Sequence, residues 1–266
     1  MNTNLIFLKL GGSLITDKNT PQHARLDVLN RLSSEIARFL SEQPTCQILL
    51  GHGSGSFGHI PAKRYNTRNG VQTEEQWRGF SEVWHAARAL NTIVMQALHQ
   101  QHIAAISFPP CAQVQTASNK IIRWDTMQIK AAIENRIVPV VYGDVVFDQE
   151  IGGTILSTEE QFEHLAAIFK PKRVLLAGIE TGVWQEFPAR KTYFPIITPQ
   201  NIAEVSQALA ASESPDVTGG MQSKVTSMMK MIQSAACEEI AIFSGNEAEN
   251  LLLALRGDQI GSRIRL

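Results

Sequence analysis

Ile48-Leu49-Leu50 runs directly into Gly51-His52-Gly53-Ser54-Gly55-Ser56-Phe57-Gly58-His59, a stretch in which four of nine residues are glycine. Glycine has no side chain to pack and loses much backbone entropy on ordering, so the pattern predicts a loop after a buried strand. Backbone N–H groups of such a loop can approach a ligand closely, and phosphate is the ligand that most needs these donors. We therefore expect a phosphate-binding loop at residues 51–59, with a purely structural glycine turn as the alternative.

Gly53, Gly55 and Gly58 also match the G-x-G-x-x-G pattern of dinucleotide-binding folds. Those folds need a second strand, about 20 residues further on, that ends in an acidic residue bound to a ribose. Residues 77–87 instead carry apolar side chains at helical spacing, and no Gly-Lys-Ser/Thr follows the glycines as in a P-loop. An NAD-dependent oxidoreductase is therefore a disfavoured alternative.

The composition is typical of a folded protein that binds a small molecule. Of the 266 residues, 44% are hydrophobic and 18% charged, which allows a large core in one domain or two lobes. The formal net charge of -1, without a basic run, argues against nucleic-acid binding. Cys46, Cys111 and Cys237 are odd in number and far apart, a pattern typical of free thiols rather than of disulfides or a zinc site.

No segment has the pattern of a signal peptide or a membrane span. Met1–Asn4 carries no basic residue, and the apolar run Leu5–Leu10 is interrupted by Lys9. A membrane-crossing helix would need about 20 apolar residues. We expect a cytoplasmic protein that does not bind a membrane.

The first 60 residues predict a βαβ unit. Leu5–Leu10 is expected to form a buried strand, residues 26–40 an amphipathic helix, and residues 47–50 a second, parallel strand. Gly11-Gly12-Ser13 follows the first strand much as the longer glycine stretch follows the second. Since ligands gather at the carboxyl ends of parallel strands, we expect both glycine segments to border one site.

The rest of the chain continues to alternate strands and helices, with a lobe boundary expected at Pro171-Lys172-Arg173 and a third glycine turn at Gly219-Gly220. The expected strands are 103–107, 137–142, 174–177, 240–243 and 260–264, with a hairpin between residues 145 and 153. The expected helices are 75–99, 124–135, 159–169, 201–211 and 224–236.

Three lysines accompany the glycine-rich turns: Lys9 and Lys18 flank the first, and Lys224 follows the third. Lys9 lies in an apolar strand, where a charge is costly without an anionic partner. Phosphoryl transfer needs mainly positioning and charge neutralisation, which backbone N–H groups and lysines supply. The chain is therefore expected to transfer a phosphoryl group, and a solvated surface position stays the alternative for Lys18.

Four motifs resemble the amino acid kinase superfamily, and the resemblance spans most of the chain. They are Lys9–Ser13, the glycine stretch closed by His59, Gly143–Val145, and Asp216–Met221 with Lys224. Within the superfamily, Ser56–His59 and Ile15–Lys18 are similar to the isopentenyl phosphate kinase family.

The resemblance implies a three-layer αβα sandwich with a mostly parallel central sheet. It places an acceptor lobe at residues 1–170 and an ATP-binding lobe at residues 171–266. The implied reaction is the ATP-dependent phosphorylation of isopentenyl phosphate, a small phosphate monoester, with Mg2+ as the accompanying ion. The sequence leaves open whether side chains hold Mg2+ or only ATP phosphates and water do, the latter being usual for a cation that dehydrates reluctantly. A homodimer is implied as well.

The resemblance also assigns roles to individual residues. Lys9, Lys18, His59 and Lys224 would be catalytic, with His59 on the acceptor phosphate and Lys18 stabilising the transition state. The nucleotide would contact Lys9, Gly11, Gly12, Ser13, Ser54, Gly178, Ile179, Gly220 and Lys224. The acceptor would contact Gly53, Ser54, His59 and Gly153, while Glu159 and Asp144 would orient the site.

Two segments depart from the superfamily pattern. Thr158-Glu159-Glu160 replaces Gly-Asp-Asp, whose aspartate organises the lysines, so Glu159 would act across one extra methylene group. Gly178–Val183 replaces Thr-Asp-Val-Asp-Gly-Val, which leaves the contacts to the base and ribose open. A nucleotide-sensing regulatory protein with a decayed active site is the alternative function.

The acceptor is the least determined part of this interpretation. A phosphate monoester has a second pKa of about 6 and arrives ionised, so no general base is needed. Phe80, Val83, Trp84 and Ile93 could line an apolar pocket, although such a stripe is more often core. Fosfomycin, carbamate, acetylglutamate and UMP stay open as acceptors. A carboxylate-bearing acceptor would need a cationic clamp, for which the candidates are Arg64, Arg68 and Arg78.

Overall fold

The structure is built on an eight-stranded sheet with the order β10-β12-β11-β9-β1-β2-β6-β3. It is a computed structural model that describes residues 4–210 and 220–266. Neighbouring strands of this sheet are parallel except β11 and β12. The strands are β1 (Leu5–Leu10), β2 (Gln47–His52), β3 (Ala105–Ser107), β6 (Val138–Tyr142), β9 (Arg173–Gly178), β10 (Ile196–Ile197), β11 (Glu239–Ser244) and β12 (Ser262–Ile264).

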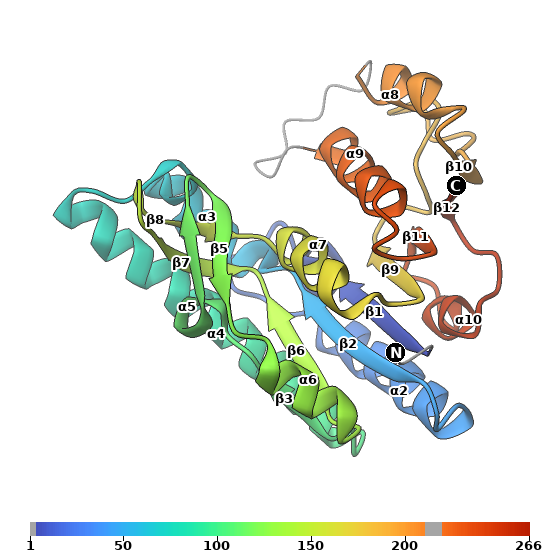
Figure 1. The fold of residues 1–266 in the computed structure, drawn as a ribbon, viewed down its shortest axis with the longest axis horizontal. Helices are drawn as coiled ribbons and strands as arrows, with labels where there is room; N and C mark the ends of the chain where they lie inside the picture. Colours follow the sequence, from blue (N-terminus) through green and yellow to red (C-terminus); the bar gives the residue numbers. More distant parts are fainter. Residues whose placement is uncertain (1–3, 211–219) are drawn as a thin grey trace.

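Side chains that alternate along the strands create a core on each face of the sheet. In β1, Leu5 and Phe7 join one core, and Ile6, Leu8 and Leu10 join the other. The first core is covered by α6 (Met127–Glu134), α7 (Thr158–Phe169), α8 (Ile202–Ala210) and α9 (Gly220–Gln233). The second is covered by α1 (Gly12–Ile15), α2 (Leu26–Glu42), α4 (Glu74–Gln100) and α10 (Asn250–Arg256). This arrangement confirms the predicted three-layer αβα sandwich (Figure 1).

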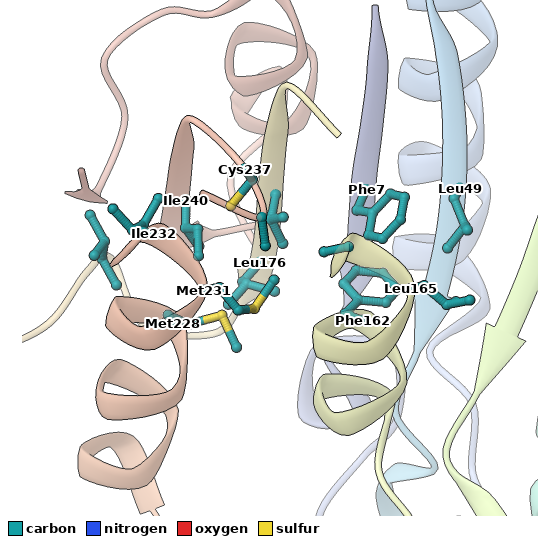
Figure 2. Close-up of a cluster of buried hydrophobic side chains, with 14 of the residues drawn as sticks. Phe7, Leu49, Phe162, Leu165, Leu176, Met228, Met231, Ile232, Cys237 and Ile240 are labelled. Atoms are coloured by element: carbon teal, nitrogen blue, oxygen red, sulfur yellow. The ribbon is translucent and has the colours of Figure 1, made fainter. Parts of the chain in front are cut away.

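Figure 2 shows the core beneath α7 and α9. Phe7 of β1 and Leu49 of β2 pack toward Phe162 of α7, and the rings of Phe7 and Phe162 have centroids 5.1 Å apart. Met228 and Ile232 of α9 pack in the same core beside β9 and β11. Both helices are therefore fixed on one face of the sheet by apolar contacts.

A second sheet of four strands has the order β5-β4-β7-β8. Its strands are β4 (Val114–Ala117), β5 (Lys120–Trp124), β7 (Asp144–Asp148) and β8 (Gly152–Leu156). β7 and β8 confirm the predicted hairpin, whereas β4 and β5 were not predicted. Asp148 joins the two hairpins, because its carboxylate accepts hydrogen bonds from the N–H groups of Ser118 (3.0 Å) and Asn119 (2.9 Å).

The βαβ prediction is confirmed, with β1 at its predicted bounds and α2 beginning at Leu26. The helix predicted over residues 124–135 is wrong at its start, because Trp124 ends β5 and α6 begins at Met127. Trp124 is buried and pairs with Val114 across the strands, and Asp125 turns the chain by accepting a hydrogen bond from the N–H of Met127 (3.0 Å). Cross-strand pairing thus overrides the local helical pattern.

The loop predicted over residues 51–59 is wrong for most of its length. Gly51 and His52 end β2, and only two residues separate them from α3 (Gly55–Arg64). The glycines instead permit close packing and an unusual turn. A Cβ on Gly51 would lie 2.5 Å from Cγ2 of Thr158, and Gly55 has a φ of +48°.

The two glycine segments meet backbone to backbone at the carboxyl ends of β1 and β2. A Cβ on Gly12 would overlap Gly55 N and lie 2.7 Å from Gly55 Cα, and one on Gly53 would lie 2.8 Å from Gly12 N. The N–H of Gly53 donates to the carbonyl of Leu10 (3.1 Å), and that of Gly11 donates to Ala177 at the end of β9 (2.8 Å). Three strand ends therefore gather at one edge, as the parallel sheet predicts.

The sheet crosses the predicted lobe boundary without interruption, because β9 pairs with β1. The division into lobes at residues 1–170 and 171–266 stays a prediction. Residues 216–219 of the third glycine motif lie outside the described residues, and Gly220 is the first residue of α9.

We expect Gly12→Ala to reduce the free energy of unfolding by about 1–3 kcal/mol, because overpacking forces well-packed atoms apart. Urea unfolding followed by circular dichroism measures this change. Gly143→Ala is the matched control, since its Cβ would meet only ordinary contacts at 3.7 Å and beyond. Equal stability of Gly12→Ala and Gly143→Ala would contradict the close backbone approach.

Candidate active site

Lys9 is placed by the alternation of β1. It lies on the same face as Phe7, the face covered by α7 and α9. Its ammonium group forms an ion pair with Oε1 of Glu159, with 12% of the lysine side chain and 18% of the glutamate side chain exposed. An anionic partner thus offsets the cost of placing a charge in an apolar strand.

Glu159 also faces Lys224 of α9, whose Nζ lies 3.9 Å from the same Oε1. Burial raises the pKa of the Glu159 carboxyl, but Lys9 and Lys224 outweigh burial and lower that pKa to about 2. The carboxylate is therefore ionised at neutral pH. The sequence left the reach of Glu159 open, and the structure brings it to both lysines.

The N-terminus of α7 holds Glu159 in place. Ser157 caps the helix by accepting a hydrogen bond from the N–H of Glu160 (3.2 Å), and the Glu160 carboxylate accepts from the N–H of Ser157 (2.7 Å). Thr158 donates its hydroxyl to the carbonyl of His52 at the end of β2 (2.6 Å). Thr158 and Glu160 thus make contacts on both sides of Glu159.

Two helices begin where β1 and β2 end, so their first N–H groups lie at this edge of the sheet. Gly11 precedes α1, and Ser54 precedes α3. The hydroxyl of Thr16 links them, because it donates to the carbonyl of Gly12 (2.7 Å) and accepts from the N–H of Ser56 (3.0 Å). Helix N-termini favour anions, so this backbone can bind phosphate groups.

Three predicted site residues lie further out. Ser13 is half-buried in α1, His59 is exposed on α3, and Lys18 is exposed in the loop that returns to α2. Asp17 shapes that loop by accepting a hydrogen bond from the N–H of Asn19 (2.8 Å). Within residues 4–210 and 220–266, no ion pair joins Lys18 to a carboxylate, so its placement at the lysine pair stays a prediction.

Asp144 begins β7 and is 99% buried beside Tyr142 and Cys111, one of three free thiols. Its Oδ1 accepts a hydrogen bond from the N–H of Val145 (2.8 Å), and Oδ2 has no hydrogen-bond partner among the described residues. Burial raises the pKa of Asp144 to about 8, against the opposing effect of the Val145 hydrogen bond. Its orienting role stays a prediction.

A small apolar cluster, which we call the α4 cluster, lies apart from the two main cores. It consists of Val71, Phe80, Val83 and Val145, with Trp84 and Ile155 among its half-buried neighbours. Gly153 of β8 packs on it, because a Cβ there would lie 2.8 Å from Cε2 of Phe80. Ile93, the fourth member of the predicted stripe, packs instead against the core beneath α2.

On the other side of β1, Gly178 ends β9 and accepts a hydrogen bond from the N–H of Gly245 (2.8 Å). Ile179 is half-buried against the second core, the one that α2 covers. Glu180, in the segment that departs from the superfamily, accepts from the indole N–H of Trp184 (2.7 Å) and pairs with Arg190 (2.9 Å). The Glu180 side chain therefore binds residues of the same loop after β9.

The three candidate clamp arginines have different surroundings. The guanidinium of Arg68 forms an ion pair with Glu160 and donates to the carbonyl of Ile155. The guanidinium of Arg64 lies 5.0 Å from the ring centroid of Tyr65, and Arg78 is exposed on α4. Arg68 therefore already binds a carboxylate within the chain.

Sequence reasoning missed His52, because it was assigned to the loop. It is fully buried at the end of β2, stacks on Tyr142 with ring centroids 5.3 Å apart, and lies 3.2 Å from Oδ1 of Asn91. Burial lowers the pKa of His52, which favours the neutral ring. Its carbonyl receives the Thr158 hydroxyl, so His52 links β2 to α7.

The model of the amino acid kinase family matches residues 4–244 of this chain. The chain belongs to that family, and the alternative of an NAD-dependent oxidoreductase is wrong. This result agrees with a parallel sheet whose strand ends carry two glycine segments, with Lys9 of β1 and Lys224 of α9 beside one carboxylate.

Similar proteins narrow the class further. The isopentenyl phosphate kinases of Methanocaldococcus jannaschii and Methanothermobacter thermautotrophicus are 34% and 31% identical, each over 98% of both chains. A crystal structure of an isopentenyl phosphate kinase matches with a TM-score of 0.82 at 29% identity, covering 98% of this chain and 100% of that chain. Within its family, the chain belongs with the isopentenyl phosphate kinases.

We expect Asp144→Asn to remove a pH dependence of stability between about pH 4 and pH 8. Because the folded protein keeps Asp144 protonated up to about pH 8 while the unfolded chain ionises near its ordinary pKa, stability falls as the pH rises through this range. The slope per group is at most about 1.4 kcal/mol per pH unit. Urea unfolding across the range measures it.

The control for this experiment is Asp258→Asn, which changes an exposed aspartate. It should leave the slope of stability against pH as in the unmodified protein. Identical slopes in Asp144→Asn and the unmodified protein would show that Asp144 is not held protonated.

Proposed function

We propose that this chain transfers the γ-phosphoryl group of ATP to the phosphate of isopentenyl phosphate, giving isopentenyl diphosphate. The observation that carries the proposal is the single carboxylate of Glu159 between Lys9 and Lys224 at the carboxyl edge of the sheet. Isopentenyl phosphate is proposed as the acceptor because the similar proteins are named isopentenyl phosphate kinases. The contacts of Glu159 disfavour a decayed regulatory site.

The lysines neutralise charge on the transferring group. Phosphoryl transfer passes through a loose transition state, for which positioning and charge neutralisation matter more than covalent chemistry. Lys9 and Lys224 approach the group from β1 and α9, and Glu159 keeps their ammonium groups oriented before the substrates bind. Lys18 reaches the transition state from its exposed loop.

The glycine segments bind the phosphates through backbone N–H groups other than those of Gly11 and Gly53, which donate to the carbonyls of Ala177 and Leu10. Gly11, Gly12 and Ser13 lie along the nucleotide phosphates, and Gly53 and Ser54 lie between donor and acceptor. The contact of Gly12 with Gly55 leaves no room for a side chain there. Donor N–H groups at this junction are therefore not screened by Cβ atoms.

The nucleotide lies on the side of β9 and α9 in this proposal. Gly178 and Ile179 follow the end of β9, and Gly220 and Lys224 belong to the first two turns of α9. This side coincides with the predicted ATP lobe, residues 171–266.

The acceptor lies on the opposite side, near α3 and the α4 cluster. His59 donates a hydrogen bond to the acceptor phosphate, whose second ionisation makes a general base unnecessary. Gly153 allows close approach beside Phe80, and the half-buried side chains of Trp84 and Ile155 offer apolar surface to a five-carbon chain. The Arg68 ion pair with Glu160 disfavours that arginine as a clamp for a carboxylate-bearing acceptor.

Mg2+ fits this site as an ion carried by ATP. Within the described residues, no group of three His, Cys, Asp or Glu side chains gathers as metal ligands, and Mg2+ retains water readily. The ion would neutralise phosphate charge when bound. A homodimer and a cytoplasmic location are part of the proposal. No helix in the described part of the chain has the length and apolar character to cross a membrane.

The test of the proposed function is ADP release with Mg-ATP and a panel of acceptors. The panel contains isopentenyl phosphate, dimethylallyl phosphate, fosfomycin, acetylglutamate, carbamate and UMP. We expect kcat/KM for isopentenyl phosphate to exceed that for the four non-prenyl acceptors by at least about 100-fold, because only a prenyl phosphate fills both the phosphate and apolar sites. Turnover confined to another acceptor would contradict the assignment of isopentenyl phosphate as the substrate. ATP binding without any turnover would favour the regulatory alternative.

We expect His59→Ala to raise KM for isopentenyl phosphate by about 10- to 100-fold, the value of a lost hydrogen bond to a charged group. KM for ATP should change much less. Steady-state kinetics with each substrate varied in turn measure both constants. His85→Ala, which removes an exposed histidine of α4, is the control. An unchanged acceptor KM in His59→Ala would contradict the role of His59.

A further inference from the structure

The first turn of α7 is held from three directions by three consecutive residues. Thr158 binds the end of β2, Glu159 binds Lys9 and Lys224, and Glu160 turns toward Arg68. Consecutive residues of a helix point about 100° apart, so one turn can serve three neighbours. A contact that moves Glu160 therefore also moves Glu159.

Arg68 and Glu160 form a bidentate ion pair. Nη2 of Arg68 lies 2.5 Å from Oε1 of Glu160, and Nη1 lies 3.2 Å from Oε2. Nη1 also donates to the carbonyl of Ile155, and the backbone carbonyl of Arg68 accepts from the hydroxyl of Thr154 (2.9 Å). Both the backbone and the side chain of Arg68 are thus tied to the end of β8 and the start of α7.

The segment that carries Arg68 also forms part of the α4 cluster. Arg68 belongs to the short helix η1 (Thr67–Asn69), and Val71, two residues after the end of that helix, is buried in the cluster. The N–H of Val71 donates to Ile151 (2.9 Å), and Gly152 packs against the Val71 carbonyl. Residues 67–71 therefore join the apolar cluster to the helix that orients the lysines.

We propose that Arg68 is a positioning residue that couples the α4 cluster to the catalytic lysines through Glu160 and Glu159. The inference rests on the proposed kinase function and adds a residue to the same site. When the hydrocarbon chain of the acceptor packs on the α4 cluster, it restricts the position of residues 67–71. The Arg68–Glu160 ion pair then restricts the position of the first turn of α7.

The exposure of the ion pair argues against a mainly stabilising role. The side chains of Arg68 and Glu160 are 41% and 30% exposed, and ion pairs so open to water contribute little to folding. A bidentate pair gives geometric specificity, because it fixes the orientation of the carboxylate as well as its distance. Its loss should therefore affect the active site more than the fold.

Arg68→Ala and Glu160→Gln test the proposal together. Glutamine at position 160 still accepts the capping hydrogen bond but loses the charge that pairs with Arg68. We expect each variant to lower kcat with isopentenyl phosphate about tenfold, and the double variant to lower it no further. Arg123→Ala, which removes an exposed arginine of β5, should keep the unmodified kcat.

Dependence on Glu159 distinguishes coupling from a merely structural effect. In a Glu159→Gln background, Arg68→Ala should have no further effect on kcat, because its route to the lysines is already broken. A full tenfold loss in that background would overturn the proposal, as would an unchanged kcat in Arg68→Ala alone.

A readout that needs no turnover separates this inference from the proposed function. In protein labelled with 13C-lysine, we expect Arg68→Ala to shift the Lys9 Cε resonance in the same direction as Glu159→Gln, and Arg123→Ala to leave it unchanged. An unmoved Lys9 resonance in Arg68→Ala would refute the coupling. Failure of the unmodified protein to use isopentenyl phosphate would refute the proposed function, while the resonance would still decide the coupling.

Discussion

The close approach of two glycine backbones, at Gly12 and at Gly53–Gly55, sets the geometry on which the rest of the site depends. A Cβ on either side would overlap backbone atoms that cannot move aside, so the ends of β1 and β2 can meet only where side chains are missing. This contact aligns the starts of α1 and α3 at one edge. The N–H groups that these helices leave unpaired are then concentrated where phosphates are proposed to bind.

The alternation of side chains along β1 places a positive charge, that of Lys9, at the same edge of the sheet. Lys9 shares its face of β1 with Phe7, so its side chain lies under α7 and α9 and not under α2. A lysine there would be costly without Glu159, and a glutamate so enclosed would be costly without two lysines. The attraction between the charges thus offsets the free-energy cost of burying them, which explains why the carboxylate stays ionised despite burial.

The two sides of the site differ in chemistry. Toward β9 and α9 the structure offers glycines and Lys224, which suits the phosphates of a nucleotide. Toward α4 it offers the small α4 cluster, which suits a short hydrocarbon chain. The Arg68–Glu160 pair spans from the apolar side to the helix that carries Glu159, so contacts within the chain connect the α4 cluster to the lysines.

The sequence by itself determined the strands and helices with a clear period, the parallel βαβ start, the class of fold and the family. Those features depend on local periodicity and on short motifs. Only the tertiary structure decided that Gly51 belongs to a strand, that Trp124 ends a strand, and that Glu159 reaches both lysines. Lys9, Glu159 and Lys224 lie far apart in the chain, and their contact depends on strand order and helix packing, which no local pattern encodes.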